Sequence, residues 1–556
     1  MRRLTISCRV TALFFMVLLA ACSGGSDRQS STSVSTNTIT FSAANPDAPT
    51  PPSQTFTATL SGGTIYVTVL YNGQAVTNAT YTLSGNTVQV VVHPASPASL
   101  GAGDFTGTVT VTGYSCGNPT CSTPTPGNTQ IVNVTYKISP IVRFVAPYVA
   151  TANTAGTVII RGQGFQQFSV TGVTFGATAA TTFTVLSDTE IQASYPALAA
   201  GSYPVQIQAP SGAGTIISQA NLVAVNAPGY AATTIAYPSA SPQVNGLVYD
   251  AERGALLVAV DSAGGEILRY PYSGGWGSAT TAAIGNISDI TLSTDGSQLL
   301  ALSQTAMTQL DPATLAAGTV TAAPVFPTAG TYFKNLAMGN DGNAVVTTGF
   351  AGSTITPEYV YASRNPAFSQ PGSTPSLDNA TPTATLDGSL IALMQGDATL
   401  TSPPAVYQYN AVTDTFYVTI VALNQNSVVP AACAYTPADS TTTTTRIVLS
   451  GTNANNASVV NVYDASYNLL GTLPDTTLAV VVKPDATRAY TFDSTASQVL
   501  SFDLTATPAG GAFPQVGSGT MPAGNPGTGV KMAISPDGGT LFLAGSNQIV
   551  VQPAPP

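Results

Sequence analysis

The feature that most constrains the fold is a turn that recurs through the C-terminal part of the chain. From about residue 229 one unit repeats: an apolar segment, a turn centred on an aspartate, and a second apolar segment. The turn aspartates are Asp250, Asp295, Asp341, Asp387, Asp439, Asp485 and Asp537, at intervals of 45, 46, 46, 52, 46 and 52 residues. This period suits a four-stranded sheet, so seven copies predict a seven-bladed β-propeller over residues 229–553.

The two ends of this region predict how the ring closes. The last repeat has room for only three strands, one fewer than a complete blade needs. The apolar segment 231–237 precedes the first repeat and can supply the missing outer strand. Pairing the two ends in this way leaves no open sheet edge.

Composition points to an all-β protein. Only 7% of the residues are charged, and Thr, Ser, Ala, Asn and Gly replace the missing charge. Thr and Val suit half-buried strands, while 51 glycines and 40 prolines supply turns. The predicted fold class is therefore all-β, with two immunoglobulin-like β-sandwiches followed by the propeller.

Residues 38–139 alternate polar and apolar side chains, as in segment 64–69, and predict an immunoglobulin-like sandwich. The Asn72-Gly73 pair predicts a hairpin turn. The run 103–111, followed by a cysteine pair and a Val-Asn-Val-Thr-Tyr ending, resembles the BACON-like modules of bacterial envelope proteins. This resemblance covers mainly the second half of the domain.

Residues 140–226 carry, in order, a Pro-Ile-Val-Arg-Phe-Val-Ala-Pro opening, an Ile-Ile-Arg-Gly-Gln-Gly-Phe segment, a Val-Thr-Phe-Gly segment and a Gly-Ser-Tyr-Pro-Val strand. This order resembles the IPT/TIG domain, which implies a second sandwich acting as a spacer or binding module without an active site. Gly162 and Gly164 predict a close bend where one strand leaves its sheet. We expect Phe165 to fill the core beneath that bend.

The N-terminus predicts a lipoprotein export signal. Two arginines follow the initiating Met, and the apolar run 10–19 is too short to span a membrane comfortably. The sequence Leu-Ala-Ala-Cys ending at Cys22 resembles the lipobox of bacterial lipoprotein precursors. The resemblance implies removal of residues 1–21, a lipid on Cys22 and, with Ser23 next, anchoring in the outer membrane. Residues 22–37 are polar and predict a flexible tether.

The remaining cysteines divide into a pair and a single residue. Cys116 and Cys121 flank a Gly-Asn-Pro turn that can bring them within bridging distance, and export places them in oxidising surroundings. Zinc would need two further ligands, and His93 is the only histidine of the chain. We therefore predict a hairpin disulfide. Cys433 is expected to be an inert apolar residue.

The charge balance excludes one class of partner. The formal net charge is −10, and three of the 15 basic residues lie in the signal. An acidic, base-poor surface repels phosphate backbones, so we expect no nucleic-acid binding.

Candidate site residues lie where the innermost strand of a blade begins, because side chains there point toward the central channel. Four repeats carry a polar residue at this place: Asn245, Asp289, Asn335 and Lys531. Such a group either binds a ligand, with Ca²⁺ as a candidate cofactor and Asp289 as its best ligand, or forms a solvated lining. Trp276, the only tryptophan, either offers a platform for a sugar or packs over an outer strand.

Two function classes remain. The repeats resemble YVTN-type and lactonase-like propellers but lack a catalytic string, and residues 229–553 contain no Gly-x-Ser-x-Gly or His-Glu-x-x-His motif. The favoured function is a non-catalytic binding, adhesion or scaffold module of the cell envelope. We expect it to be a monomer held to the membrane by its lipid, with an envelope protein or polysaccharide as partner. The alternative, implied by the lactonase-like resemblance, is a metal-assisted hydrolase or lactonase that uses the channel.

Overall fold

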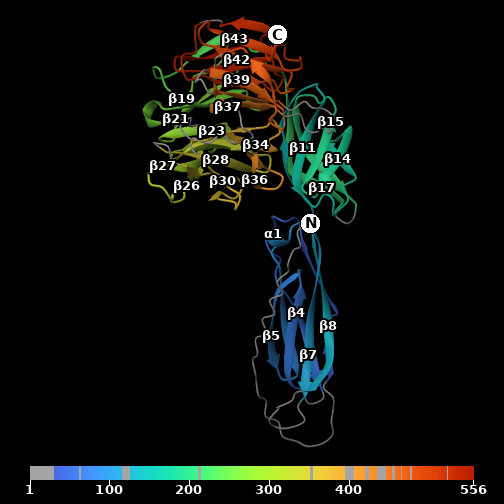
Figure 1. The fold of residues 1–556 in the computed structure, drawn as a ribbon. Coiled ribbons are helices and arrows are strands. Elements are labelled where there is room, and N and C mark those ends of the chain that lie inside the picture. Colours follow the sequence, from blue (N-terminus) through green and yellow to red (C-terminus); the bar gives the residue numbers. More distant parts are fainter. Residues whose placement is uncertain are drawn as a thin grey trace, which may run out of the picture. The chain divides into compact units, whose positions relative to one another are not determined.

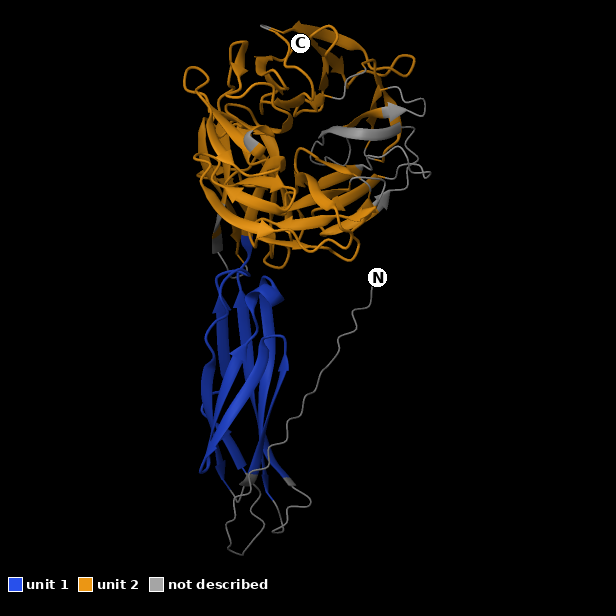
Figure 2. Ribbon diagram, turned by 90° about the vertical axis from the view of Figure 1, so that its left-hand side faces the viewer, with its two compact units in different colours: residues 1–141 blue, residues 142–556 orange. Residues whose placement is uncertain are grey.

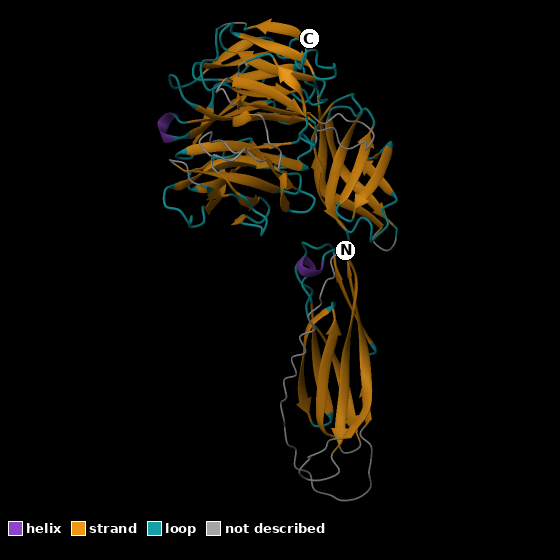
Figure 3. Cartoon of the chain, viewed as in Figure 1, coloured by secondary structure: helices purple, strands orange, loops and turns teal. Residues whose placement is uncertain are grey.

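The computed structural model describes residues 31–556, except 62–63, 116–124, 211–213, 351–354, 378, 395–405, 420–424, 435–445, 454–457, 465, 476–478 and 522–523. Regular structure in these residues is almost entirely β, as predicted (Figure 3). Their helical segments are α1 (Pro97–Leu100) and the 3-10 turn η1 (Ser262–Gly264). Neither could cross a membrane. The chain forms two compact units, residues 1–141 and 142–556 (Figure 2).

The first unit is a β-sandwich of two four-stranded sheets, ordered β1-β3-β6-β5 and β2-β8-β7-β4. Its strands are β1 (Ser31–Val34), β2 (Thr38–Ala43), β3 (Gln54–Ser61), β4 (Thr64–Gly73), β5 (Val76–Ser84), β6 (Thr87–Pro94), β7 (Gly103–Ser115) and β8 (Thr125–Ile138). Alternate residues face the core: Val88, Val90 and Val92 of β6 are fully buried. The predicted period of two therefore places one face of each sheet inside the sandwich.

Two expectations for this unit were wrong. Residues 31–34, expected within the tether, form β1 and pair with the edge of β3, since their backbone groups find partners there. The Asn72-Gly73 pair does not make a hairpin, because β4 pairs with β7 and β5 pairs with β6. The chain instead changes sheets there. The segment carrying Cys22, Cys116 and Cys121 lies outside the described residues.

The second sandwich opens the second unit. Its strands are β9 (Ile141–Ala146), β10 (Val149–Thr151), β11 (Gly156–Gln163), β12 (Gly172–Phe175), β13 (Thr178–Ala179), β14 (Thr182–Ser187), β15 (Glu190–Tyr195), β16 (Gly201–Ala209) and β17 (Gly214–Val225). They form sheets ordered β14-β15-β11-β9 and β10-β17-β16-β12-β13. Phe165 is fully buried in the core, as predicted. Gly164 turns the chain there with φ +90°, and its N–H donates to Asp188 at 3.1 Å.

The rest of the second unit is a seven-bladed propeller, which confirms the prediction. Each blade is a four-stranded sheet, and its first-named strand is the innermost. The first three blades are β19 (Val244–Asp250), β20 (Ala255–Val260), β21 (Glu266–Pro271), β22 (Thr280–Ala283); β23 (Ile287–Leu292), β24 (Leu299–Ser303), β25 (Ala306–Leu310), β26 (Ala317–Ala322); and β27 (Thr331–Met338), β28 (Asn343–Phe350), β30 (Tyr359–Ala362), β31 (Ala367–Ser369). The other four are β33 (Thr381–Ala384), β34 (Leu390–Met394), β35 (Val406–Asn410), β36 (Thr415–Thr419); β37 (Gln425–Ala434), β38 (Arg446–Asn453), β39 (Ser458–Tyr463), β40 (Leu469–Leu473); β41 (Val480–Val482), β42 (Arg488–Asp493), β43 (Gln498–Asp503), β44 (Gln515–Thr520); and β45 (Lys531–Ile534), β46 (Thr540–Ala544), β47 (Gln548–Pro553), β18 (Thr233–Ala236).

The ring closes as the sequence predicts. Strand β18 pairs antiparallel with β47, so the first strand of the propeller completes the last blade. The innermost strands neighbour one another in sequence order, and β45 neighbours β19. Figure 1 shows the blades coloured from green at β19 to red at β43. A short two-stranded sheet of β29 (Thr356–Pro357) and β32 (Ser376–Leu377) flanks the third blade. All innermost strands run in the same direction, so their first residues converge at one end of the channel.

Candidate functional site

A cavity of about 910 Å³ lies where the innermost strands begin. We call it the channel mouth. Its lining includes Gln243, Asn245, Asp261, Ser288, Gln304, Tyr332, Lys334, Asn335 and Lys531. The cavity is of the size typical for ligand pockets, about 300–1,000 Å³.

Three of the four predicted site residues lie on this lining: Asn245, Asn335 and Lys531. Asp289 lies beside the mouth, and its carboxylate accepts hydrogen bonds from the backbone N–H of Ile290 at 2.9 Å and of Leu336 at 3.1 Å. The Asn335 amide donates to it at 3.5 Å. Asp289 therefore ties the second blade to the third.

The surroundings of Asp289 also govern its ionisation. Some of its surface remains exposed, but protein atoms enclose the carboxylate closely, and this desolvation raises its pKa to about 6. Lys531 and the three hydrogen-bond donors partly offset the rise in pKa. Gly246 makes room for this arrangement, since a Cβ there would lie 2.9 Å from the Asp289 Oδ1.

These contacts bear on the predicted calcium site. The oxygens of Asp289 face N–H donors, whereas Ca²⁺ is held by six to eight oxygen ligands. No group of three or more Asp, Glu, His or Cys side chains that could hold a metal occurs among the described residues. The Ca²⁺ site at Asp289 stays a prediction.

A repeated β-bulge builds one side of the mouth. In β19, β23 and β27 the pairing register shifts near the start of the strand, and the residues at the shifts are Asn245, Ser288 and Lys334. Each of the three donates a hydrogen bond to a backbone carbonyl of the following blade: Asn245 to Ile287 at 2.8 Å, Ser288 to Phe333 at 2.9 Å, and Lys334 to Asn379 at 3.0 Å. The bulge thus directs one polar side chain per blade toward the mouth.

The bulge also corrects the predicted equivalence of the site residues. Asn245 corresponds to Ser288 and Lys334, whereas Asp289 and Asn335 correspond to Gly246. Sequence reasoning therefore missed Ser288 and Lys334. A bulge inserts one residue without a strong sequence signature, and a residue count along the repeat cannot detect it. The one available signal for Lys334 was its rarity, because the chain contains only four lysines.

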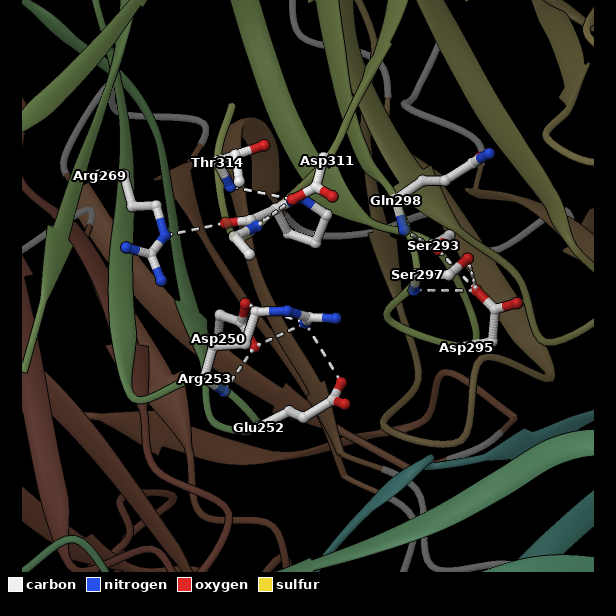
Figure 4. A network of polar contacts seen from close by, with 12 residues as sticks. Asp250, Glu252, Arg253, Arg269, Ser293, Asp295, Ser297, Gln298, Asp311 and Thr314 are labelled. Atoms are coloured by element: carbon white, nitrogen blue, oxygen red, sulfur yellow. Dashed lines mark hydrogen bonds and ion pairs between the residues drawn. The ribbon is translucent and has the colours of Figure 1, made fainter. Parts of the chain in front are cut away.

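The opposite ends of the same strands carry the repeated aspartate turns. In four of these turns the aspartate Oδ1 accepts the backbone N–H two residues on: Ser297 to Asp295 at 3.1 Å, Asn343 to Asp341 at 3.1 Å, Ser389 to Asp387 at 3.1 Å and Thr487 to Asp485 at 3.0 Å. Asp250 accepts the N–H of Arg253, three residues on, and Asp439 lies outside the described residues. Figure 4 shows Asp295 held by Ser293 and Ser297, and Asp250 paired with Arg253 at 3.1 Å. The turn aspartates are structural, as predicted.

The second sandwich packs against this turn end of the propeller. A Cβ at Gly296 would collide with the Tyr148 ring, and one at Gly342 would collide with Phe144. The Arg364 guanidinium lies 4.2 Å from the centre of the Phe144 ring. These contacts join two glycines of the repeated turns to Phe144 in β9 and to Tyr148 in the loop that follows it.

A buried ion pair lies in the same contact. Arg161 pairs with Glu190 at 3.2 Å, and only 6% and 11% of the two side chains are exposed. The second guanidinium nitrogen of Arg161 donates to the carbonyl of Ala411 in the propeller. Burial raises the pKa of Glu190, and Arg161 partly offsets this rise. The pair therefore fixes the sandwich to the fourth blade.

Beside this pair, one hydroxyl lies between two carboxylates. Tyr409 Oη is 2.7 Å from Asp341 Oδ2 and 2.8 Å from Asp414 Oδ1. A phenol has one hydrogen to donate, so both contacts are favourable only when one carboxylate carries a proton. Burial raises the pKa of Asp341 to about 6, so below that pH Asp341 carries the proton that both contacts require.

Trp276 is partly buried and packs where the first and last blades meet. Its ring lies 4.9 Å from Tyr230 and 5.2 Å from Tyr272, centre to centre. Phe542 of the last blade completes the cluster at 6.1 Å. The packing interpretation of Trp276 is confirmed, and the side chain helps to join the two ends of the ring.

Comparison with known proteins identifies one domain. Residues 140–223 match the family model of the IPT/TIG domain. A search of curated proteins found no match. Similar solved structures include hydrazine synthase of Kuenenia stuttgartiensis, with 12% identity, a TM-score of 0.40 and coverage of 59% of this chain and 99% of that one. The Pan2 WD40 domain of Neurospora crassa has 13% identity and a TM-score of 0.40, covering 57% and 93%.

TM-scores this low do not support a fold assignment, so the propeller is assigned from its seven four-stranded sheets. The BACON-like and lactonase-like resemblances stay predictions. Together, the sequence order, the two packed sheets and the family match lead to one identification: residues 140–223 are an IPT/TIG domain, joined in this chain to the turn end of a seven-bladed propeller.

Proposed function

We propose that this chain is a non-catalytic binding protein of the bacterial cell envelope, and that the channel mouth of its propeller holds the ligand. We further propose that a lipid on Cys22 anchors it in the outer membrane and that it acts as a monomer. The two sandwiches would then serve as spacers that present the propeller to an envelope polymer or protein.

The observation that carries this proposal is the difference between the two ends of the innermost strands. At the turn end, the IPT/TIG domain packs against the second, third and fourth blades, and aspartates accept hydrogen bonds within their own turns. The mouth end opens into a cavity of about 910 Å³ lined by amides, hydroxyls and two ammonium groups. Concave surfaces with convergent polar groups are where proteins bind ligands.

The chemistry of the mouth supports binding over catalysis. Its lining carboxylate, Asp261, accepts the backbone N–H of Gln243 at 2.7 Å, and Asp289 already holds three donors. A general base must be within reach of a substrate proton. Residues 142–556 also contain no histidine.

A co-sedimentation experiment tests the proposal. The mature chain with Cys22→Ser, freed of its lipid, is mixed with insoluble cell-wall polysaccharide and with outer-membrane vesicles. We expect it to bind one of the two, and Gln243→Ala/Gln304→Ala to reduce that binding several-fold. Gln515→Ala, on an exposed outer strand, is the matched control and should bind normally.

Two outcomes would contradict the proposal. One is equal binding by the mouth variant and the wild type, which would place the ligand elsewhere. The other is hydrolysis of simple lactones or esters by the purified chain, abolished by Asp289→Asn. That second result would support the alternative, a hydrolase that uses the channel.

A further inference from the structure

The mouth concentrates a rare residue type. The chain has four lysines, and two of them, Lys334 of β27 and Lys531 of β45, line the mouth. Of the other two, Lys483 lies at the turn end of the propeller, where it pairs with Asp485 at 2.7 Å, and Lys137 lies in the first sandwich. In a chain with a formal net charge of −10, two ammonium groups on one cavity are a distinct local feature.

The negative charge near the mouth is already engaged. Asp261, the carboxylate among the lining residues, is held by the Gln243 backbone. Asp289 lies beside the mouth and directs its oxygens toward N–H donors of the second and third blades. Lys334 also donates to the Asn379 carbonyl at 3.0 Å, and the charge of Lys531 acts on the Asp289 carboxylate. Both ammonium groups line the cavity, and Asp261 is the carboxylate among the lining residues, an arrangement that favours an anion over a cation.

The uncharged residues of the lining indicate which chemical groups the rest of the ligand carries. Most other side chains of the lining carry amides or hydroxyls, such as Gln243, Asn286 and Gln304. Few are apolar, and Val244 and Phe492 are among them. Amides and hydroxyls both donate and accept hydrogen bonds. They match a ligand covered with hydroxyl groups better than an apolar peptide.

We propose that the channel mouth binds an acidic polysaccharide, with the ammonium groups of Lys334 and Lys531 pairing with uronic-acid carboxylates and the amides and hydroxyls of the lining contacting the sugar hydroxyls. The inference rests on the proposed function, which makes the mouth the ligand site. It reverses the polarity of the site expected from the sequence, which offered Asp289 as a ligand for a cation.

Isothermal titration calorimetry tests this inference with matched probes. The lipid-free mature chain is titrated with pentamers of galacturonate, glucuronate and mannuronate, and with the methyl ester of each. Each methyl ester removes the negative charge and adds one small methyl group per sugar. We expect at least one acid to bind about tenfold or more tightly than its ester, and less tightly as salt rises.

Substitutions of the lysines test whether the affinity for the acid comes from the channel mouth. Lys334→Met and Lys531→Met should each weaken binding about fivefold, the upper range for a partly exposed ion pair. Lys531→Arg retains the charge and should keep most of the affinity. Lys483→Met removes a lysine from the opposite end of the propeller and should change nothing. Circular dichroism and thermal unfolding establish that each variant is folded.

The outcomes separate the two proposals. Binding of none of the acids, equal binding of acids and esters, or affinity unaffected by Lys334→Met and Lys531→Met would each overturn the inference. Equally tight, lysine-dependent binding of pentaglutamate would also overturn it, because charge alone would then suffice. If the acids fail while Gln243→Ala/Gln304→Ala still reduces binding to the envelope fraction, the inference falls and the proposed function stands.

Discussion

The two ends of the propeller's innermost strands are made from the same repeat and differ in what their side chains do. At the turn end, aspartates accept hydrogen bonds from their own turns, and glycines leave room for Tyr148 and Phe144 of the IPT/TIG domain. At the mouth end, bulged residues differ from blade to blade: an asparagine, a serine and a lysine. The turn end repeats because each blade needs the same turn. The mouth end varies, as a surface shaped for one ligand would.

The difference between the ends also separates two kinds of polar group. Several polar side chains at the turn end, such as Arg161 and Asp387, are buried and hydrogen-bonded, so their loss should lower stability. Several at the mouth, such as Gln304, are exposed, so their loss should lower binding alone. Substitutions at the two ends test this separation.

The largest expected loss of stability follows from breaking the buried ion pair at the turn end. Arg161→Ala leaves the Glu190 carboxylate buried without its partner, which should lower the free energy of unfolding by about 3–5 kcal/mol. Lys483→Ala breaks the more exposed pair with Asp485 and should cost less than about 1 kcal/mol. Urea denaturation measures both. Similar losses would show that the sandwich contact does not stabilise the unit.

The second effect is a dependence of stability on pH with an unusual sign. Burial raises the pKa of Asp289 and of Asp341 to about 6, and that of Glu358 well above its ordinary value. Between the unfolded pKa of about 4 and pH 6, the folded chain binds more protons than the unfolded chain. The free energy of unfolding should therefore fall as pH rises through this window, by on the order of 3 kcal/mol for a group shifted by about two units.

Thermal unfolding checks this sign. The Tm should be several degrees higher near pH 5 than near pH 7.5, and Asp341→Asn should reduce the difference. Groups with lowered pKa values, such as Asp485 and Asp503, oppose this trend only near and below pH 4, where they are protonated. A Tm that rises steadily from pH 5 to pH 7.5 would contradict the account of the buried carboxylates.

A pair of glycines isolates the contact between the IPT/TIG domain and the propeller. Gly296 and Gly285 lie beyond opposite ends of β23 and both have positive φ, +65° and +78°. Alanine at either position strains the backbone, but only at Gly296 would the new Cβ meet the Tyr148 ring. We expect Gly296→Ala to cost about 1–3 kcal/mol more than Gly285→Ala. Equal losses of stability in the two variants would mean that the IPT/TIG domain can move away from the propeller at little cost in free energy.

The smallest effects distinguish residues within the mouth. Ser288 donates to the Phe333 carbonyl, so Ser288→Ala should cost about 1 kcal/mol of stability. Gln304 is exposed on the lining, and Gln304→Ala should change stability by less than about 0.5 kcal/mol. Chemical denaturation of the two variants gives the comparison. A large loss for Gln304→Ala would show that the mouth lining also has a structural role.

Much of this architecture could be predicted because it follows from periodic requirements. The spacing of the turns predicted seven blades, and the missing strand in the last repeat predicted the closure by β18. The position of Phe165 followed from its place after two glycines. In each case the local sequence determines the structure, through the turn that it forms, the alternation of its side chains or the sheet edge that it must cover.

The sequence did not predict features that depend on tertiary context. The Asn72-Gly73 pair is a hairpin signal, yet the chain uses it to change sheets, because β4 finds its partner in β7. The bulges at the mouth shift the register by one residue, so Lys334 was missed and Asp289 was assigned to the lining. The contact of the IPT/TIG domain with the propeller joins residues far apart in the sequence.

The most direct test of the central claim, that the mouth end meets the ligand and the turn end does not, uses the lysines as reporters. Acetylation of the lipidated protein in native envelopes is compared with that of the purified chain, and the extent at each lysine is read by mass spectrometry. We predict that Lys334 and Lys531 lose reactivity in the envelope relative to Lys483, because a ligand covers the mouth. Unchanged reactivity at both mouth lysines, with protection of Lys483, would contradict the account.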